Sequence, residues 1–339
     1  MTKTSVTIND IARELNISPS TVSRALNNSS KISESKKIQI RQKAAELGYA
    51  LNLVASSLSK NKTNIIGVVI PGTESYFYSQ ALKGIEEAAR TAGYKILISQ
   101  TNDSYDREKD ALMLLQSARV DGIIASMALD TSETNHFNKL INNRIPLVLF
   151  DRVNFSIPCH KVIVDNYDGA FQATSHLIKT RCKRLAYLGG PANCTIFQDR
   201  AKGFKDALKH SGIEPQAGFM LTTDLTYTDV LEVMKRWMSL PQPPDGIFAA
   251  TSSSGLLATK LATDAGINVP QDLAIVAFGY QPANDYIVPG LSAVEMSGYD
   301  MGKAATTELL NEITGSPGEI SNIILPVNLV IRNSSFRQA

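Results

Sequence analysis

Hydrophobic and polar positions alternate with two different periods along this chain. Up to residue 48 apolar residues recur every three or four positions, which predicts short amphipathic helices. From Ile65 onward, continuous apolar runs such as IIGVVI and PLVLF alternate with helical segments, a pattern typical of buried parallel strands joined by crossover helices. The plan occurs twice, ending at PLVLF and again at LAIVAF. We therefore expect a helical head followed by two similar α/β lobes.

The stretch TINDIARELNISPSTVSRALN predicts two short helices joined by a tight turn. Thr7 and Asp10 have the spacing of a capping box, Ser18 is a favourable N-cap, and Pro19 suits the first position of a helix. The second helix carries polar side chains of the types that bond bases and phosphates: Ser20, Thr21, Ser23, Arg24 and Asn27. We interpret the stretch as a helix-turn-helix whose second helix reads DNA. The alternative is a solvated helical hairpin.

A third helix is expected from Ser33 to Leu47, with an apolar face formed by Ile38, Ala45 and Leu47. Its basic side chains should point outward: Lys36, Lys37, Arg41 and Lys43.

The segment that follows, YALNLVASSLSKNKTN, predicts a two-turn helix from Asn52 to Ser59. Isolated helices shorter than ~12 residues are marginal in water, so this one should form only against a partner chain or DNA. Its apolar residues could wedge into a minor groove. The alternative is a linker packed on the next domain.

The charge of the 339-residue chain is unevenly distributed. The net charge is only +2, but residues 1–62 contain ten basic and four acidic residues, whereas the remainder contains 24 basic and 28 acidic residues. A local excess of positive charge favours a polyanion, because neutralising phosphates releases counterions.

Composition excludes several other classes of protein. With 43% hydrophobic residues, no apolar run long enough to span a bilayer and no apolar signal core, the sequence indicates a cytoplasmic, nucleoid-associated protein without a membrane partner. Cys159, Cys182 and Cys194 lack metal-ligand spacing, so we expect reduced thiols, no metal and no cofactor. In open α/β sheets ligands bind outside the carboxyl ends of the strands, and the cleft between the lobes is therefore the expected ligand site.

Taken together, the motifs resemble those of the lactose-repressor (LacI-type) transcription regulators along almost the whole chain. The resemblance rests on the helix-turn-helix stretch together with ELGYALNLVASSL, IIGVVIP, VDGIIAS, IPLVLFDR, VDNYDGA, DRAKGF, PDGIF, GINVPQDLAIVAF and LPVNLVIRNSS. It implies a head at 1–50, a hinge at 51–62 and an effector-binding and dimerisation region at 63–339. Lobe 1 would comprise about 63–164 and 293–323, and lobe 2 about 165–292 and 324–335, as in periplasmic-binding-protein-like folds.

The resemblance also implies how the head contacts DNA. Base edges would be reached by Pro19, Ser20 and Arg24, with Arg24 reading guanine. Phosphate contacts would come from Ser18, Thr21, Ser23 and Asn27. Thr7 is also expected to contact DNA. In the hinge, Leu58 matches a leucine that wedges between base pairs, with Asn52 and Ala55 as its minor-groove neighbours. The family often has Pro where this chain has Leu51, which leaves the start of the hinge helix open.

For the effector cleft, the resemblance implies residues from both lobes: Phe77, Tyr78, Asp151, Arg152, Arg200, Phe248, Ser252 and Gly279. Ser252 and Gly279 stand where many members have acids, while Arg152 and Arg200 are kept. A less negative cleft favours an anionic effector, a sugar acid or sugar phosphate, over a neutral sugar. The alternative interpretation is that the aromatic residues belong to the core and that Asp151 and Arg152 form a structural ion pair.

The expected function is a ligand-responsive DNA-binding repressor of carbohydrate-utilisation genes, binding a palindromic operator as a homodimer. One alternative is a solute-binding protein without DNA function, which the basic head opposes. Another is a regulator controlled by a protein partner. We do not expect an enzyme, because the sequence has no Walker-type phosphate loop, dinucleotide glycine fingerprint or nucleophile elbow.

Overall fold

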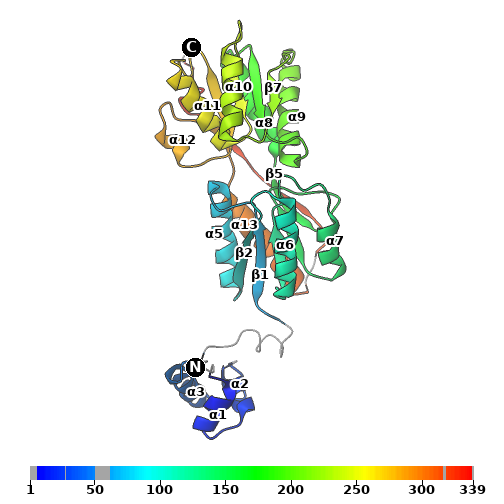
Figure 1. Cartoon of the computed structure of the whole chain (residues 1–339), viewed down its shortest axis with the longest axis vertical. Helices are drawn as coiled ribbons and strands as arrows, with labels where there is room; N and C mark the ends of the chain where they lie inside the picture. The colour runs from blue at the N-terminus through cyan, green and yellow to red at the C-terminus, as the bar shows by residue number, and fades with distance from the viewer. Residues whose placement is uncertain (1–5, 27, 50–61, 316–317, 338–339) are drawn as a thin grey trace. The chain divides into compact units, whose positions relative to one another are not determined.

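The computed structural model describes residues 6–26, 28–49, 62–315 and 318–337. The chain forms two compact units, divided between Thr63 and Asn64 (Figure 1). Asn27, Asn52, Ala55 and Leu58, and with them the expected hinge helix, lie outside the described residues.

The N-terminal unit contains three helices: α1 (Ile8–Glu14), α2 (Pro19–Leu26) and α3 (Glu34–Glu46). At the start of α1 the Asp10 carboxylate accepts from the Thr7 backbone N–H at 2.9 Å, as in a capping box, and from the Thr7 hydroxyl at 2.7 Å. At the turn between α1 and α2, Asn16 has a left-handed φ of 49°. The core joins all three helices through Ile11, Ala12, Val22, Ala25, Ile40 and Ala44.

The buried face of α3 differs from the expected one. Ile38 is 53% exposed and Ala45 is also exposed, whereas Lys37, Ile40 and Ala44 are buried. These three residues follow the i, i+3, i+7 spacing of one helical face, whereas Ile38 and Ala45 lie on the neighbouring face. The prediction that Lys37 points outward was therefore wrong. Its alkyl stem packs inward and its ammonium group donates to Glu34 at 2.7 Å.

The first lobe is built on a parallel sheet with the strand order β11-β5-β4-β3-β1-β2. The strands are β1 (Ile65–Ile70), β2 (Lys95–Gln100), β3 (Gly122–Ala125), β4 (Leu147–Phe150), β5 (His160–Val164) and β11 (Asn322–Leu325). One face is covered by α5 (Tyr76–Thr91) and α13 (Gly298–Ile313), the other by α6 (Tyr105–Ser117) and α7 (Asn135–Asn142). Burial on both faces explains the continuous apolar runs of β1, β3 and β4, whereas the edge strands β2 and β11 are partly exposed.

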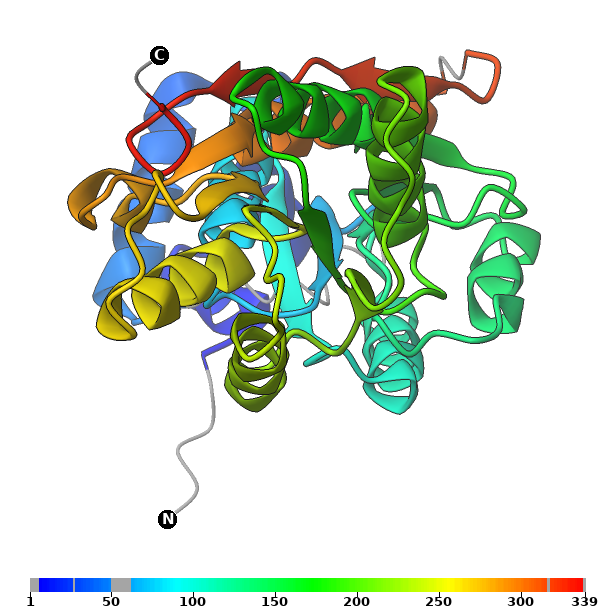
Figure 2. The same cartoon turned by 90° about the horizontal axis from the view of Figure 1, so that it is seen from above.

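The second lobe repeats the plan with the order β12-β10-β9-β8-β6-β7. Figures 1 and 2 show the helices that cover its sheet in green to yellow. Its strands are β6 (Leu185–Gly189), β7 (Met220–Thr222), β8 (Gly246–Ala249), β9 (Ala274–Phe278), β10 (Ser292–Glu295) and β12 (Asn328–Val330), the last antiparallel to β10. Helices α8 (Asn166–Lys179) and α9 (Thr195–His210) cover one face. The other face is covered by α10 (Tyr227–Met238) and α11 (Ser252–Asp264), and a short α12 (Ala283–Tyr286) follows β9.

The chain crosses between the lobes three times: after β5, after β10 and after β11. The last two crossings differ from the expected positions near residues 292 and 323. Strand β10 pairs with β9 in the second lobe before the chain leaves it, and β11 pairs with β5 as far as Leu325. Each crossing thus follows a completed strand, which places all three connections beside one cleft. No helix in the described part of the chain is long and apolar enough to cross a membrane.

Candidate functional site

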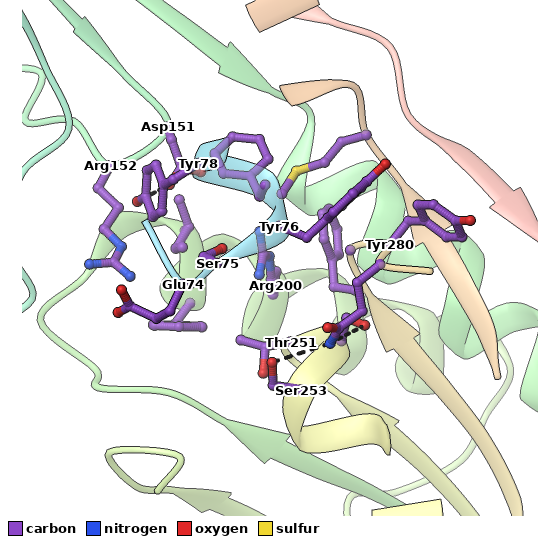
Figure 3. A pocket seen from close by; sticks show the side chains of 18 residues that line it. Glu74, Ser75, Tyr76, Tyr78, Asp151, Arg152, Arg200, Thr251, Ser253 and Tyr280 are labelled. Atoms are coloured by element: carbon purple, nitrogen blue, oxygen red, sulfur yellow. Dashed lines mark hydrogen bonds between the residues drawn. The ribbon is translucent and has the colours of Figure 1, made fainter. Parts of the chain in front are cut away.

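A pocket between the two lobes brings together seven of the eight residues expected to bind an effector (Figure 3). The first lobe contributes Phe77 and Tyr78 from α5, and Asp151 and Arg152 from the segment after β4. The second lobe contributes Arg200 from α9, Ser252 from the start of α11, and Gly279, which follows β9. They meet because the carboxyl ends of the parallel strands of both sheets face the cleft.

Phe248 does not line this pocket. It lies in the middle of β8, is fully buried, and packs among the rings of Tyr187 and Phe204, with centroid distances of 5.7 and 6.5 Å. Ala249 and Ala250 follow it before the chain reaches the cleft, and its side chain points toward the layer formed by α8 and α9. It is a core residue, as the alternative interpretation of strand-end aromatics allowed.

Arg200 is a buried cation at the floor of the pocket, with only 2% of its surface exposed. Its Nε donates to Asn166 Oδ1 at 2.9 Å, and Nη1 donates to the Ala250 carbonyl at 2.6 Å. The guanidinium carbon lies 3.7 Å from the centroid of the Phe278 ring. The third nitrogen, Nη2, is buried and has no hydrogen-bond partner among the described residues. An unpaired buried donor is costly, so this nitrogen is suited to a ligand oxygen.

Burial shifts the pKa of three groups that line the pocket: Asp151, Tyr78 and Arg200. It raises the pKa of Asp151, although Arg152 and the bond from Tyr78 oppose the shift. The Tyr78 hydroxyl donates to Asp151 Oδ2 at 2.7 Å and lies 3.0 Å from the Ser126 hydroxyl. Burial also raises the pKa of Tyr78 well above its usual value, so this phenol stays protonated and holds the carboxylate. In the same surroundings burial lowers the pKa of Arg200 to about 10, which leaves it charged at neutral pH.

Arg152 is tied to the first lobe. Its Nη1 donates to Asp103, which follows β2, while its buried Nε has no partner among the described residues. Asp103 and Asp151 both have left-handed φ values, 60° and 58°. Such backbone conformations are uncommon for residues other than glycine and occur often at ligand sites.

Ser252 and Gly279, which stand where many family members have acids, are each held in a defined conformation. The Ser252 hydroxyl donates to Asn284 Oδ1 at 2.7 Å and accepts from Gln281 Nε2 at 3.2 Å. Gly279 has φ of 95°, a conformation that disfavours any residue with a side chain. The amide of Gln281 thus contacts Ser252, one of the two positions where many family members have an acid.

Several lining residues were not identified from the sequence: Glu74, Ser75, Tyr76, Ile196, Phe197, Thr251, Ser253, Phe278, Tyr280, Gln281 and Met296. Tyr76 and Tyr280 belong to different lobes, and their rings contact edge to face with centroids 5.8 Å apart. Both could have been identified from their positions, because Tyr76 begins the helix that follows β1 and Tyr280 lies two residues after β9. With Glu74 included, the lining holds two carboxylates and two arginines, so charge alone does not select an anionic effector.

Of the described residues expected to contact DNA, six lie in or directly before α2, and Thr7 precedes α1; the six are Ser18, Pro19, Ser20, Thr21, Ser23 and Arg24. Ser18 precedes α2 and caps it, because its hydroxyl accepts from the Thr21 backbone N–H at 3.2 Å. That hydroxyl also lies within 2.9 Å of the Ser20 hydroxyl and 2.8 Å of the Thr21 hydroxyl. Pro19, Ser20 and Arg24 are exposed, whereas Val22 and Ala25 face the core. Helix α2 is therefore amphipathic, with a polar side available to a partner.

Two family models match the chain. The model described as bacterial regulatory proteins of the lacI family matches residues 7–52, and the model of a periplasmic binding protein-like domain matches residues 174–335. The ribose operon repressor of Halalkalibacterium halodurans is 31% identical over 331 residues, covering 97% of each chain. Catabolite control protein A of Priestia megaterium is 30% identical over 97% of this chain and 99% of its own.

Solved structures show the same fold. A lac repressor dimer bound to operator and the anti-inducer ONPF aligns with a TM-score of 0.88 at 23% identity, over 98% of this chain and 100% of the repressor chain. The transcription regulator CcpA of Lactococcus lactis aligns with a TM-score of 0.75 at 22% identity, over 80% of this chain and 99% of its own.

Proposed function

The chain belongs to the lacI family of bacterial regulatory proteins and is a DNA-binding transcriptional regulator, and we propose that it represses carbohydrate-utilisation genes under the control of a small molecule bound between its lobes. The observation that carries the proposal is the buried Nη2 of Arg200, a donor without a partner among the described residues, in a pocket lined by both lobes. A ligand at this position would contact both lobes and could alter their angle.

For the DNA-binding part, the support is the amphipathic α2 together with the basic excess of residues 1–62. A head with one reading helix covers one half-site. Two copies related by a two-fold axis would bind a palindromic operator, and we therefore propose that the chain acts as a homodimer on double-stranded DNA.

The effector we propose is a sugar, a sugar acid or a sugar phosphate. Aromatic rings at Tyr76 and Phe77 could lie against the apolar face of a sugar ring, while Asp151 and the Arg200 guanidinium could bond its hydroxyl groups. The balanced charge of the lining is compatible with both neutral and anionic members of this class. The relatives named as a ribose operon repressor and a catabolite control protein favour carbohydrate control in general.

The proposal is tested by measuring binding of the purified full chain to fragments of genomic DNA, first alone and then with D-ribose, D-glucuronate or D-glucose 6-phosphate. We expect specific binding to a palindromic sequence and a change in affinity with at least one compound. An absence of sequence-specific binding under all four conditions would contradict the operator proposal.

Specific binding that none of the compounds alters would contradict the proposed effector class while leaving the regulator assignment in place. Direct calorimetric titration of the same compounds separates binding in the pocket from an effect on DNA. If the glucuronate and the phosphate bind while ribose does not, the anionic preference inferred from Ser252 and Gly279 is supported. The reverse order would contradict it.

A further inference from the structure

Asn166 lies at the junction between the effector pocket and the first crossing of the chain between the lobes. It is the first residue of α8 and follows β5 after a single intervening residue, Asp165. Only 5% of its surface is exposed. Asn166 is absent from the pocket lining, so it would not contact an effector directly.

The carboxamide of Asn166 makes one hydrogen bond to the pocket arginine and one to the end of β5. Its Oδ1 accepts from Arg200 Nε at 2.9 Å, and its Nδ2 donates to the Val164 carbonyl at 3.3 Å. Val164 is the last residue of β5 in the first lobe, whereas Arg200 lies on α9 in the second. One side chain thus connects the pocket arginine to the backbone at the point where the chain changes lobes.

The orientation of Arg200 depends on this bond. Nη1 is fixed by the Ala250 carbonyl and the guanidinium carbon lies over the Phe278 ring, but among the described residues only Asn166 accepts from Nε. With Nε and Nη1 both held, the fork geometry of the guanidinium leaves Nη2 as the nitrogen available to a ligand. Rotation at the crossing would move the acceptor of Nε and would therefore turn Nη2 away from its direction in this lobe arrangement.

We propose that Asn166 is a positioning residue that aims Arg200 at the effector and links that aim to the angle between the lobes. The inference rests on the proposed function, because it assumes that Arg200 contacts the effector. It assigns no new ligand. It identifies the residue through which occupancy of the pocket and the crossing between the lobes influence one another.

Two substitutions distinguish the contribution of the Asn166 bond to Arg200 from that of its bond to Val164. Asn166→Asp keeps an acceptor for Arg200 Nε but replaces the donor to Val164 with an oxygen that the carbonyl repels. Asn166→Ala removes both bonds and leaves Nε buried without an acceptor. Gln172→Ala is the matched control, because Gln172 lies on the same helix and bonds only Asp168 among the contacts described. Thermal denaturation of each variant establishes that the lobes remain folded.

The first measurement needs no effector. Spin labels at Asp110→Cys on α6 and Lys235→Cys on α10 report the distance between the lobes, because both positions are exposed while Cys159, Cys182 and Cys194 are buried. The labelled chain is mixed with an excess of unlabelled chain, so that each dimer carries at most one labelled copy and only the distance within that copy is measured. We expect a shifted or broader distance distribution in Asn166→Asp and Asn166→Ala, but not in Gln172→Ala. Unchanged distributions in both Asn166 variants would overturn the link to the lobe angle.

The second measurement is calorimetric titration with D-ribose, D-glucuronate and D-glucose 6-phosphate. For any of these that binds the unaltered protein, we expect Asn166→Ala to weaken binding at least about tenfold, because a bond to a charged group is lost. Asn166→Asp should stay within about threefold, since its carboxylate still anchors Nε. Equal affinities in Asn166→Ala and the unaltered chain would overturn the positioning role. If none of the three compounds binds the unaltered protein, the proposed effector class fails, whereas the distance measurement still decides whether Asn166 is linked to the lobe angle.

Discussion

At the level of single residues, the two pocket arginines are distinguished by buried N–H donors that lack a hydrogen-bond acceptor among the described residues. Arg200 and Arg152 each keep a buried nitrogen without a partner among the described residues, although each is otherwise held by hydrogen bonds. A residue with a purely structural role would be expected to satisfy these donors. The sequence could place both arginines near the cleft, but it could not show which nitrogen remains free, because that depends on partners such as Asn166 and Asp103.

Phe248 and Phe278 offer a matched pair at the residue scale, because they lie on adjacent strands and both are almost fully buried. Only Phe278 contacts Arg200 and lines the pocket. We expect Phe248→Leu and Phe278→Leu to lower the free energy of unfolding by similar amounts, about 1–2 kcal/mol, less than truncation to Ala would. Effector affinity, measured by titration with the compound that binds, should fall only in Phe278→Leu. An equal fall in effector affinity in Phe248→Leu would contradict the assignment of Phe248 to the core alone.

Arg24 is the residue in the head whose predicted role is easiest to isolate. It is exposed on α2, and an arginine that bonds a guanine edge contributes about 1–3 kcal/mol of discrimination between bases. We expect Arg24→Ala to lose specific operator affinity while its affinity for unrelated DNA changes little. Arg13→Ala is the control, since Arg13 is a similarly exposed arginine on α1. Competition binding against random DNA measures the specific and the non-specific affinity. An equal loss of operator affinity in Arg24→Ala and Arg13→Ala would indicate a general charge effect.

At the level of elements, most of the helices and strands were predictable because their apolar periods are regular. The errors occurred where the period is ambiguous. In α3 the sequence contains apolar residues on two adjacent faces, and a lysine stem occupies part of the buried one, so Ile38 and Ala45 were assigned to the core in place of Lys37 and Ala44. The late crossings were misplaced because the end of a strand is decided by its partner, β9 for β10 and β5 for β11, which the local pattern does not contain.

The contact between α8 and the C-terminal segment gives a pH-dependent prediction. His176 Nε2 lies 2.8 Å from the Ser335 hydroxyl, which itself donates to Ser292 on β10 at 2.7 Å. Burial lowers the pKa of His176. The neutral form is therefore favoured in the folded state, so its contribution is present above the unfolded pKa of about 6.5 and is lost as the pH falls through the folded value.

We expect the second lobe to lose less stability on acidification from pH 8 to pH 5 when His176 is replaced by Gln. Trp237, the single tryptophan of the chain, is buried in this lobe and reports its unfolding in urea by fluorescence. His210→Gln is the control, because His210 is exposed at the end of α9. Identical pH dependence in His176→Gln and the unaltered protein would exclude His176 as a source of the acid sensitivity.

At the level of the whole molecule, the two-lobed plan and the site between the lobes followed from the repeated strand pattern, but the balance of charge in the pocket did not. Glu74 and Asp103 come from segments whose strands end at the cleft, and they offset the arginines on which the expectation of an anionic effector was based. Arrangements of this kind depend on loops from both lobes. The apolar periodicity predicts the strands that precede these loops, but it does not predict where the loop side chains point.

The lobes are also held together by hydrogen bonds outside the pocket lining. Asn193 Nδ2 donates to the Leu129 carbonyl at 2.8 Å, and the Thr195 hydroxyl donates to the Val153 carbonyl at 3.1 Å. Thr195 is the first residue of α9, the helix that carries Arg200, and Asn193 lies two residues before it. They stabilise the lobe arrangement seen here and would be broken or altered by a change in the lobe angle.

Replacing Asn193 with Ala and Thr195 with Val together should move the lobe equilibrium by about tenfold or more, at about 1 kcal/mol for each bond. If the effector weakens operator binding, effector and operator favour different arrangements, so the double variant should change their affinities in opposite directions; if it strengthens operator binding, both should change in the same direction. Gln198→Ala is the control, since its amide bonds Ala192 within the same lobe. Titration and operator binding measure the two affinities. If both stay unchanged in the double variant, the lobe angle cannot be what connects the effector to DNA.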